Sequence, residues 1–227
     1  MLELHEGYRN AKRFFTYENA ANYDSIVQFT TLGQDSVWKS HIIKIIGKRH
    51  IVLDIACGTG ILSSMLKAKD AAMKVISLDL EFNYLQIAKG KRKNLVLTNG
   101  TAEILPFKNE YFDSVISSYL AKYVNMKIVV DECWRILRPN GIVVFHDFIY
   151  PKNQIFRKFW HTYFMILKVG GHITKTWLTV FKELDKLVEA SRWVELTLDF
   201  LKGKGFRNIV CTHYTFGTAA IISARKP

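Results

Sequence analysis

The stretch from Ile51 to Leu62, IVLDIACGTGIL, constrains the fold of this chain more than any other part of its sequence. Apolar residues surround Asp54, and a run of small residues at 56–60 then opens a second apolar segment. A short apolar run of this kind is typical of a buried parallel strand, and the small residues predict a sharp turn into a helix. Because Gly58 and Gly60 lack a Cβ, a ligand can approach the turn closely. The N–H groups of the following helix favour a ligand that carries a carboxylate or phosphate.

A second apolar strand, KVISLDL at residues 74–80, follows the predicted helix and ends on an acid. The carboxylate of Asp79 could accept hydrogen bonds from both hydroxyls of a ribose. Neither a dinucleotide fingerprint nor a phosphate-binding loop is complete, because Ile61 and Leu62 follow the last glycine. Strand, glycine turn, helix, strand and terminal acid together predict a βαβ unit that binds a nucleoside.

The composition indicates one globular domain. The chain has 227 residues, of which 49% are hydrophobic, enough for one α/β core with a small insertion. Cys57, Cys133 and Cys211 are widely spaced and odd in number, which is evidence against a disulfide framework or a zinc site and favours a reducing cytoplasm. The first 15 residues are polar and charged, and no window of 18 residues is wholly apolar, so neither a signal peptide nor a membrane span is expected.

The net charge of +12 is unevenly distributed. Residues 151–227 contain 13 Lys and Arg against five Asp and Glu, so an anionic partner would bind in the C-terminal third. Nucleic acid, an anionic membrane surface and a basic surface with no partner are all compatible with this bias. We expect no stable nucleic-acid complex, and we expect a cytoplasmic protein with peripheral membrane contact. The sequence predicts no oligomeric state.

The periodicity predicts a single domain over residues 1–227, in which residues 1–50 are a helical cover over the sheet edge and residues 151–192 a helical lid insertion. Strands are expected at residues 51–55, 74–80, 94–99, 112–117 and 142–148, with two more around Gly217. Helices are expected at residues 81–93, 124–138, 151–171, 175–190 and 193–202.

The first lid helix has an aromatic stripe interleaved with basic residues. Its apolar residues at helical spacing are Ile155, Phe156, Phe159, Trp160, Tyr163, Phe164 and Leu167. A helix that faces the core is the favoured interpretation. A helix at a membrane interface, or one that covers an apolar substrate, is the alternative.

The pair LDIACGTG and SLDL resembles the S-adenosylmethionine (SAM) site of the Rossmann-like, class I methyltransferases. This resemblance implies an α/β fold with a seven-stranded, mostly parallel sheet, an antiparallel C-terminal strand and helices on both faces. It implies SAM as the cofactor and no metal. The cofactor-binding residues that it implies are Tyr23, Asp54, Ala56, Gly58, Gly60, Asp79, Leu80, Thr101, Ala102 and Ser117.

Three further motifs resemble the ubiquinone/menaquinone biosynthesis C-methyltransferases. They are the N-terminal pattern from Tyr23-Asp24 to Trp38-Lys39, the AEILPF loop at residues 102–107, and the tail with Gly205-Phe206 and TFG at 215–217. The resemblance implies methyl transfer to a ring carbon of a prenylated quinol, a small hydrophobic substrate. The chain departs from the family at Thr101, where Asp or Asn is usual, and at residues 119–123, where YLAKY replaces Phe-Gly-Leu-Arg-Asn. The family's Phe-Pro before the penultimate helix is also absent.

Ring methylation of a quinol needs a base, because loss of the hydroxyl proton makes the ring carbon nucleophilic. His146 and Asp147 end the fifth predicted strand, and strand alternation lets one of them point into the cleft. Lys122, at the position of the family's arginine, could hold the phenolate. A purely structural role for His146 stays open.

Three alternative functions remain at this point. A methyltransferase of another lipid or small hydrophobic molecule would use the same lid. An RNA base-amine methyltransferase usually has Asn or Asp, then Pro-Pro and an aromatic residue, where this chain has Ser-Ser-Tyr-Leu at 117–120. A SAM-binding scaffold without activity is the third alternative.

Overall fold

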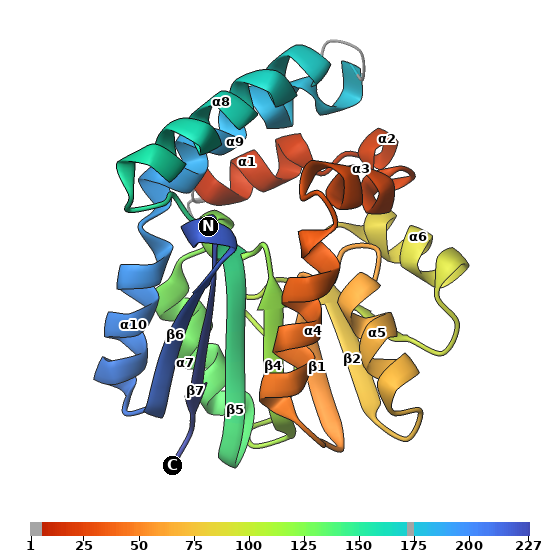
Figure 1. Ribbon diagram of the computed structural model, residues 1–227. Coiled ribbons are helices and arrows are strands. Elements are labelled where there is room, and N and C mark those ends of the chain that lie inside the picture. The colour runs from red at the N-terminus through yellow and green to blue at the C-terminus, as the bar shows by residue number, and fades with distance from the viewer. Residues whose placement is uncertain (1–5, 172–174) are drawn as a thin grey trace.

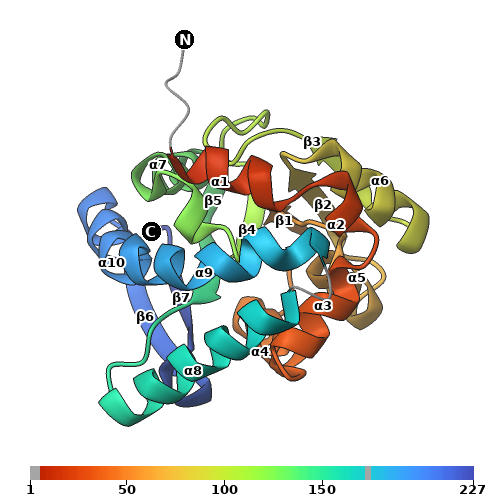
Figure 2. The ribbon, with the colours of Figure 1, turned by 90° about the horizontal axis from the view of Figure 1, so that it is seen from above.

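In the described part of the chain, seven strands form one sheet in the order β3-β2-β1-β4-β5-β7-β6 (Figures 1 and 2). The bounds of the strands are β1 Ile51–Ile55, β2 Lys74–Asp79, β3 Val96–Asn99, β4 Phe112–Ser118, β5 Leu137–Phe148, β6 Arg207–Tyr214 and β7 Ala219–Arg225. The pairs from β3 to β5 are parallel, and β7 runs antiparallel to both β5 and β6. This confirms the predicted Rossmann-like sheet with its antiparallel C-terminal strand.

The computed structural model describes residues 6–171 and 175–227. The first residues of the polar N-terminal segment, 1–5, and residues 172–174 of the predicted lid therefore lie outside the described residues. No helix in the described part is long and apolar enough to cross a membrane.

Helices cover both faces of the sheet. On one face, α4 (Gln34–Ile46) and α5 (Ile61–Lys69) bury apolar side chains against β1, β2, β4 and β5. On the other face, α7 (Met126–Ile136) and α10 (Trp193–Lys204) bury apolar side chains against the same sheet. The expectation that residues 1–50 cover the sheet edge is wrong for α4, because Ile42, Ile43 and Ile46 all pack into the core of one face.

The strand β5 begins earlier than predicted. The helix α7 ends at Ile136, and Leu137 already pairs with Phe112 of β4. The register then shifts, so that Ile142 pairs with Ser114, and the residues between them form an irregularity in the strand. Asn140 has a φ of 63°, in the left-handed region that asparagine adopts more readily than most residues. The helix expected at residues 124–138 therefore ends at Ile136, and the residues that follow it form an irregularity inside the strand.

A layer of helices lies over the carboxyl ends of the parallel strands (Figures 1 and 2). Its members are α1 (Glu6–Phe14), α2 (Tyr17–Ala20), α3 (Tyr23–Thr30), α8 (Gln154–Gly171), the 3₁₀ turn η2 (Lys175–Trp177) and α9 (Leu178–Ser191). Phe14, Phe164 and Trp177 share a third apolar core with Tyr123 of the 3₁₀ turn η1 (Ala121–Tyr123). The helix α6 (Phe82–Lys91) contacts α2, β2 and β3.

The aromatic stripe of α8 does not all face the core as predicted. Phe164 and Leu167 are buried in the upper layer, whereas Ile155 is 64% exposed and Phe159 is 69% exposed. At 100° per residue, the stripe is too wide for one contact face and divides into an inner and an outer half. The outer half also includes Ile166, which is exposed.

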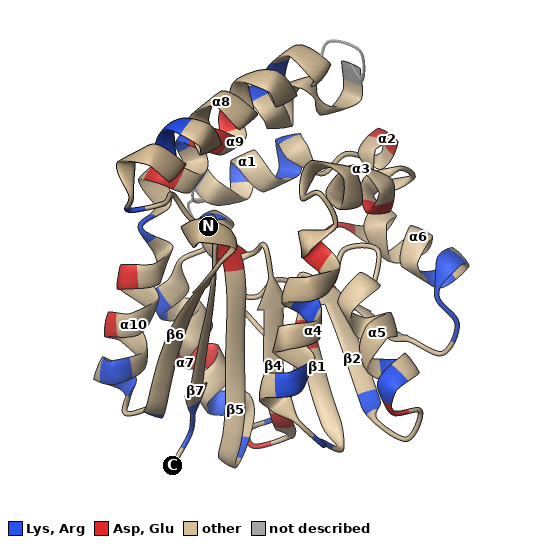
Figure 3. Ribbon diagram, viewed as in Figure 1, with Lys and Arg blue, Asp and Glu red and all other residues tan. Residues whose placement is uncertain are grey.

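Ion pairs neutralise part of the basic C-terminal third. Arg157 pairs with Glu189, and Lys168 pairs with Asp185 at 2.6 Å. Figure 3 accordingly shows acidic residues on α9 and α10 and basic residues on α8. The five acids are already counted in the net charge of this region, so its basic residues remain in excess.

Candidate active site

The glycine turn between β1 and α5 has the backbone conformation that its sequence predicts. Ala56, Gly58 and Gly60 have φ of 56°, 55° and 78°, and the turn is closed by a hydrogen bond from the Gly60 N–H to the Cys57 carbonyl. A Cβ on Gly60 would lie 2.8 Å from Leu95, so this glycine serves packing. A Cβ on Gly58 would meet only tyrosine rings, at 3.8 Å and beyond, so this glycine borders the cavity.

Asp79 stands beside the turn at the end of β2. Its carboxylate accepts the Gly58 N–H at 2.7 Å and the Glu81 N–H at 2.8 Å. Burial raises the pKa of Asp79 to about 6, although the backbone N–H groups act to lower it. Each carboxylate oxygen can accept a further hydrogen bond, so this side chain could bind ribose hydroxyls as predicted.

Asp54 lies beneath the turn instead of facing the main cavity. Its carboxylate accepts a hydrogen bond from Ser63 of α5 at 2.6 Å, and the Ser63 hydroxyl also contacts Ser77 of β2. Burial raises the pKa of Asp54 to about 7. In this arrangement the carboxylate links β1, α5 and β2, and any contact with a ligand would come through the small pocket that it borders under the turn.

The main cavity opens at the carboxyl ends of β1, β2 and β4 and is covered by α1. Seven of the predicted cofactor residues line it: Tyr23, Ala56, Gly58, Asp79, Leu80, Thr101 and Ala102. Asp54, Gly60 and Ser117 do not. The Ser117 hydroxyl donates to the Ile55 carbonyl inside the sheet, whereas the neighbouring Ser118 lines the cavity.

An aromatic wall closes the cavity under α1. Phe15 makes edge contacts with Tyr84 and Tyr123 at 5.7 Å and 5.5 Å between ring centroids, and Tyr23 meets Tyr84 at 5.4 Å. The Tyr84 hydroxyl is buried and has no hydrogen-bond partner in the described part of the chain. Electron-rich rings of this kind attract a cation.

The acid of the N-terminal motif fastens the glycine turn to two helices, a role that the sequence reading missed. Asp24 of α3 accepts hydrogen bonds from the Thr59 hydroxyl and, at 2.7 Å, from Arg92 at the end of α6. Thr59 is fully buried. The spacing of Tyr23-Asp24 and the glycine turn contains no signal for this contact, because the two segments lie 35 residues apart.

His146 and Asp147 point to different neighbours, as strand alternation predicts. The His146 Nδ1 lies 2.8 Å from the Ser118 hydroxyl, and its Nε2 has no partner among residues 6–171 and 175–227. Burial lowers the pKa of His146 well below its usual range, and the charges of Lys39 and Lys122 lower it further. The imidazole is therefore neutral at physiological pH. It does not line the main cavity, but Ser118 connects it to that space.

Asp147 and Lys122 pair with each other. Their charged atoms are 2.5 Å apart, and the Lys122 ammonium also donates to the Tyr119 carbonyl at 3.3 Å. Burial lowers the pKa of Lys122, and the Asp147 charge opposes that shift. Neither side chain lines the main cavity, so contact of Lys122 with a bound phenolate would need a rearrangement.

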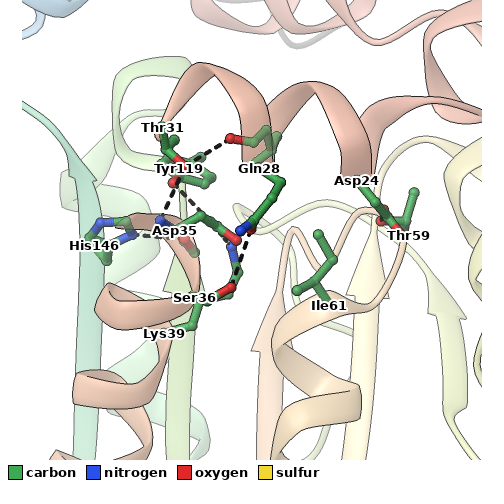
Figure 4. Close-up of polar contacts among 12 residues, drawn as sticks. Asp24, Gln28, Thr31, Asp35, Ser36, Lys39, Thr59, Ile61, Tyr119 and His146 are labelled. Carbon is green, nitrogen blue, oxygen red and sulfur yellow. Dashed lines mark hydrogen bonds and ion pairs between the residues drawn. The ribbon is translucent and has the colours of Figure 1, made fainter. Parts of the chain in front are cut away.

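Figure 4 shows a second buried ion pair, between Asp35 and Lys39 of α4, next to Tyr119 and His146. The Asp35 carboxylate accepts hydrogen bonds from the Lys39 ammonium and, at 2.9 Å, from the Tyr119 hydroxyl. Asp35 is 2% exposed and Lys39 is 4% exposed. In the sequence, Lys39 stands only within the N-terminal motif, and no sequence pattern marks Asp35 or Tyr119 as site residues.

A mostly parallel sheet of this order with an antiparallel C-terminal strand, a glycine turn after β1 and an acid at the end of β2 is the architecture of the class I SAM-dependent methyltransferases. The sequence profile of the ubiE/COQ5 methyltransferase family matches residues 7–226. The chain belongs to this family.

Curated relatives cover nearly the whole chain. A demethylmenaquinone methyltransferase from Chlorobaculum parvum is 28% identical over 96% of this chain and 93% of its own length. A ubiquinone/menaquinone biosynthesis C-methyltransferase UbiE from Stutzerimonas stutzeri is 26% identical over 92% of this chain and 86% of its own length. Among solved structures, a putative S-adenosyl-L-methionine-dependent methyltransferase from Methanococcus maripaludis has the same fold, with a TM-score of 0.68, 20% identity and 95% coverage of both chains.

Proposed function

We propose that the protein transfers a methyl group from SAM to a ring carbon of a demethylated, prenylated quinol. The family match over residues 7–226 carries this proposal. SAM supplies a methyl group on a positively charged sulfur, which any well-placed nucleophile can take. The cavity residues fit such a group, because an acid suited to ribose and a wall of aromatic rings suited to a cation line the same space.

The parts of the cofactor would be held by different walls of the cavity. Asp79 would accept the ribose hydroxyls, and Thr101 and Ala102 would bind the adenine. The aromatic wall of Phe15, Tyr23, Tyr84 and Tyr123 would surround the sulfonium. This wall also excludes water, which strengthens every electrostatic interaction inside the site.

Ser118 and His146 would remove the proton from the substrate hydroxyl. Ser118 lines the cavity and contacts the neutral His146, so the proton would leave through the serine hydroxyl to the Nδ1 atom. The electron pair left on oxygen raises the electron density of the adjacent ring carbon, which would take the methyl group as the bond between that methyl and the sulfonium sulfur breaks. The ring hydrogen at that carbon would then leave as a proton to solvent, and the proton held at Nδ1 would return through Ser118 to the substrate oxygen, which restores the aromatic quinol. The Asp147–Lys122 pair is the second candidate for the base and the phenolate contact.

A hydrophobic substrate tail would lie in the apolar groove between α8 and the ends of α3 and α4. The groove is lined by apolar or aromatic side chains on both sides, among them Leu32, Trp38, Phe156, Trp160 and Phe216. Trp38 packs on His146, and Trp160 meets Phe148, the ring that stacks on Tyr119. Ring contacts from Trp160 to Phe148 and from Phe148 to Tyr119 thus connect a wall of the groove to a wall of the cavity.

The test is mass spectrometry of short-chain demethylmenaquinol and demethoxyquinol analogues incubated with SAM under reductant. The reduced ring should gain one methyl on carbon, and the oxidised quinone should not, because only the quinol has a hydroxyl to deprotonate. His146→Ala and Ser118→Ala should slow the reaction by roughly 10²–10⁴-fold if they form the base. Asp147→Asn should slow the reaction by a similar factor if the Asp147–Lys122 pair supplies the base instead.

Labelled SAM with total lipid extract and then with RNA tests the competing functions. Label in another lipid, or in RNA, with no quinol methylated would overturn the quinol assignment in favour of those substrates. Binding of SAM without turnover on any fraction would indicate a scaffold.

A further inference from the structure

A small pocket adjoins the main cavity under the glycine turn. Lys39, Asp54 and Cys57 are among its walls. It shares five lining residues with the main cavity: Tyr23, Ala56, Gly58, Ser118 and Tyr119. The small pocket is therefore a continuation of the cavity toward α4.

Lys39 is the only Lys or Arg among the described residues that line these two spaces. Its side chain is 5% exposed, so the ammonium is almost completely removed from water. In the described ranges, the Asp35 carboxylate is its one hydrogen-bond acceptor, and the Tyr119 ring lies 5.0 Å away on another side. An ammonium has three N–H donors, so this one keeps donors available for a further acceptor.

The partners of Lys39 hold it in place. Asp35 is one turn earlier on α4, and its carboxylate also accepts the Tyr119 hydroxyl at 2.9 Å, as Figure 4 shows. The Asp35 backbone N–H donates to the Thr31 hydroxyl at 3.2 Å, which anchors the first turn of the helix. The cation is thus positioned before any ligand arrives, which reduces the entropy lost on binding.

Lys122, the other buried lysine nearby, is differently placed. Its ammonium has two acceptors, the Asp147 carboxylate at 2.5 Å and the Tyr119 carbonyl at 3.3 Å. It lines neither of the two spaces. Lys39 is therefore the cation that an anionic group near the glycine turn would meet.

We propose that Lys39 binds the carboxylate at the amino-acid end of SAM and that Asp35 positions it. This inference rests on the proposed cofactor. With the ribose at Asp79, the amino-acid end must pass the glycine turn, and the small pocket continues from Gly58 toward Lys39. A carboxylate in that pocket meets a desolvated ammonium, where a charge-assisted hydrogen bond is about twice as strong as a neutral one.

Calorimetric titration of the wild-type protein with SAM and with decarboxylated SAM tests the proposal directly. The two ligands differ by the carboxylate alone, so SAM should bind about 10- to 100-fold more tightly, the value of a lost hydrogen bond to a charged group. Equal affinity overturns the inference. Binding of neither ligand would instead refute the proposed cofactor.

Two variants then locate the effect. Asp35→Asn keeps the ammonium but removes the carboxylate that positions it, and should reduce the preference for SAM without abolishing it. Asp35→Asn with Lys39→Gln removes both charges and should bring the two affinities within about threefold. Removing the charges together avoids leaving an uncompensated buried ion. A double variant that keeps the preference, or that weakens both ligands equally, shows that Lys39 does not bind the carboxylate. If the double variant does not fold, the preference is measured instead in Lys39→Arg. This variant keeps a cation and should retain the preference for SAM. A folded Lys39→Arg variant that binds SAM without this preference would contradict the proposal.

Discussion

The Lys122 ammonium lies 2.5 Å from the Asp147 carboxylate, and the two side chains are 2% and 0% exposed. These are two of the three residues that the sequence suggests for catalysis, and the fold places them against each other. One carboxylate oxygen of Asp147 is also buried without a partner in the described part of the chain. Removing one partner alone would leave a buried charge uncompensated, whether or not the pair contributes to chemistry.

Lys122→Met should therefore destabilise the protein strongly. It leaves the Asp147 carboxylate uncompensated in the interior, which costs about 3–5 kcal/mol of unfolding free energy. The measurement is unfolding in guanidinium chloride. The matched control, Lys122→Met with Asp147→Leu, removes both charges and should regain most of that loss. A single variant within about 1 kcal/mol of the wild type would show that water reaches the pair.

Asp54→Asn should change how stability depends on pH. The folded pKa of Asp54 is raised to about 7 from 3.8, so between those values the folded protein holds a proton that the unfolded chain has lost. The unfolding free energy of the wild type should therefore fall, by up to about 1.4 kcal/mol per pH unit, as the pH rises from 5 to 7, and this contribution should level off above 7.

In the Asp54→Asn variant this contribution is absent, while the amide oxygen can still accept the Ser63 hydroxyl. Asp199→Asn, at an exposed carboxylate of α10, is the control and should leave the wild-type slope unchanged. Parallel pH profiles for the wild type and the Asp54→Asn variant would contradict the raised pKa.

Asp79→Asn should weaken the binding of SAM or S-adenosylhomocysteine about 10- to 100-fold. The amide replaces one acceptor oxygen that faces the ribose with a donor, and a hydrogen bond to a charged group contributes about 1.5–3 kcal/mol. Isothermal titration calorimetry gives the affinity, with Asp199→Asn again as the control. An unchanged dissociation constant would remove Asp79 from the ribose site.

The outer half of α8 should bring the protein to anionic membranes. Phe159 and Ile166 are 69% and 62% exposed, and Lys158 and His161 are exposed beside them. Apolar side chains that enter the interface, together with basic ones near it, bind anionic lipid at low salt and release it as salt screens the charges. We expect the wild type to co-sediment with phosphatidylserine-containing vesicles in 20 mM salt, on the order of one tenth of physiological ionic strength.

Phe159→Ser with Ile166→Ser should abolish this co-sedimentation. Val210→Ser, at a residue of β6 that is 54% exposed on another part of the molecule, should not. Equal recovery on neutral vesicles, or none on either, would leave α8 as a lid without a membrane role.

Residues 51–80 could be predicted from the sequence because strand, turn, helix and strand follow one another along the chain. Their periodicity and small residues are local properties, and these decide the βαβ unit, the left-handed glycine turn and the place of Asp79 at a strand end. The left-handed φ of Asn140 is likewise a local property, because asparagine adopts this conformation more readily than most residues.

Only the tertiary structure decided which side chains meet. Neighbouring residues of a strand point to opposite faces of the sheet. The register of β4 therefore decides that Ser118, and not Ser117, lines the cavity. Tyr119 reaches Asp35 across 84 residues of sequence, through helix packing that no local pattern encodes. Periodicity assigns a residue to a face, but the contacts of a buried charge depend on where separate elements come together, and this protein's site is built from such contacts.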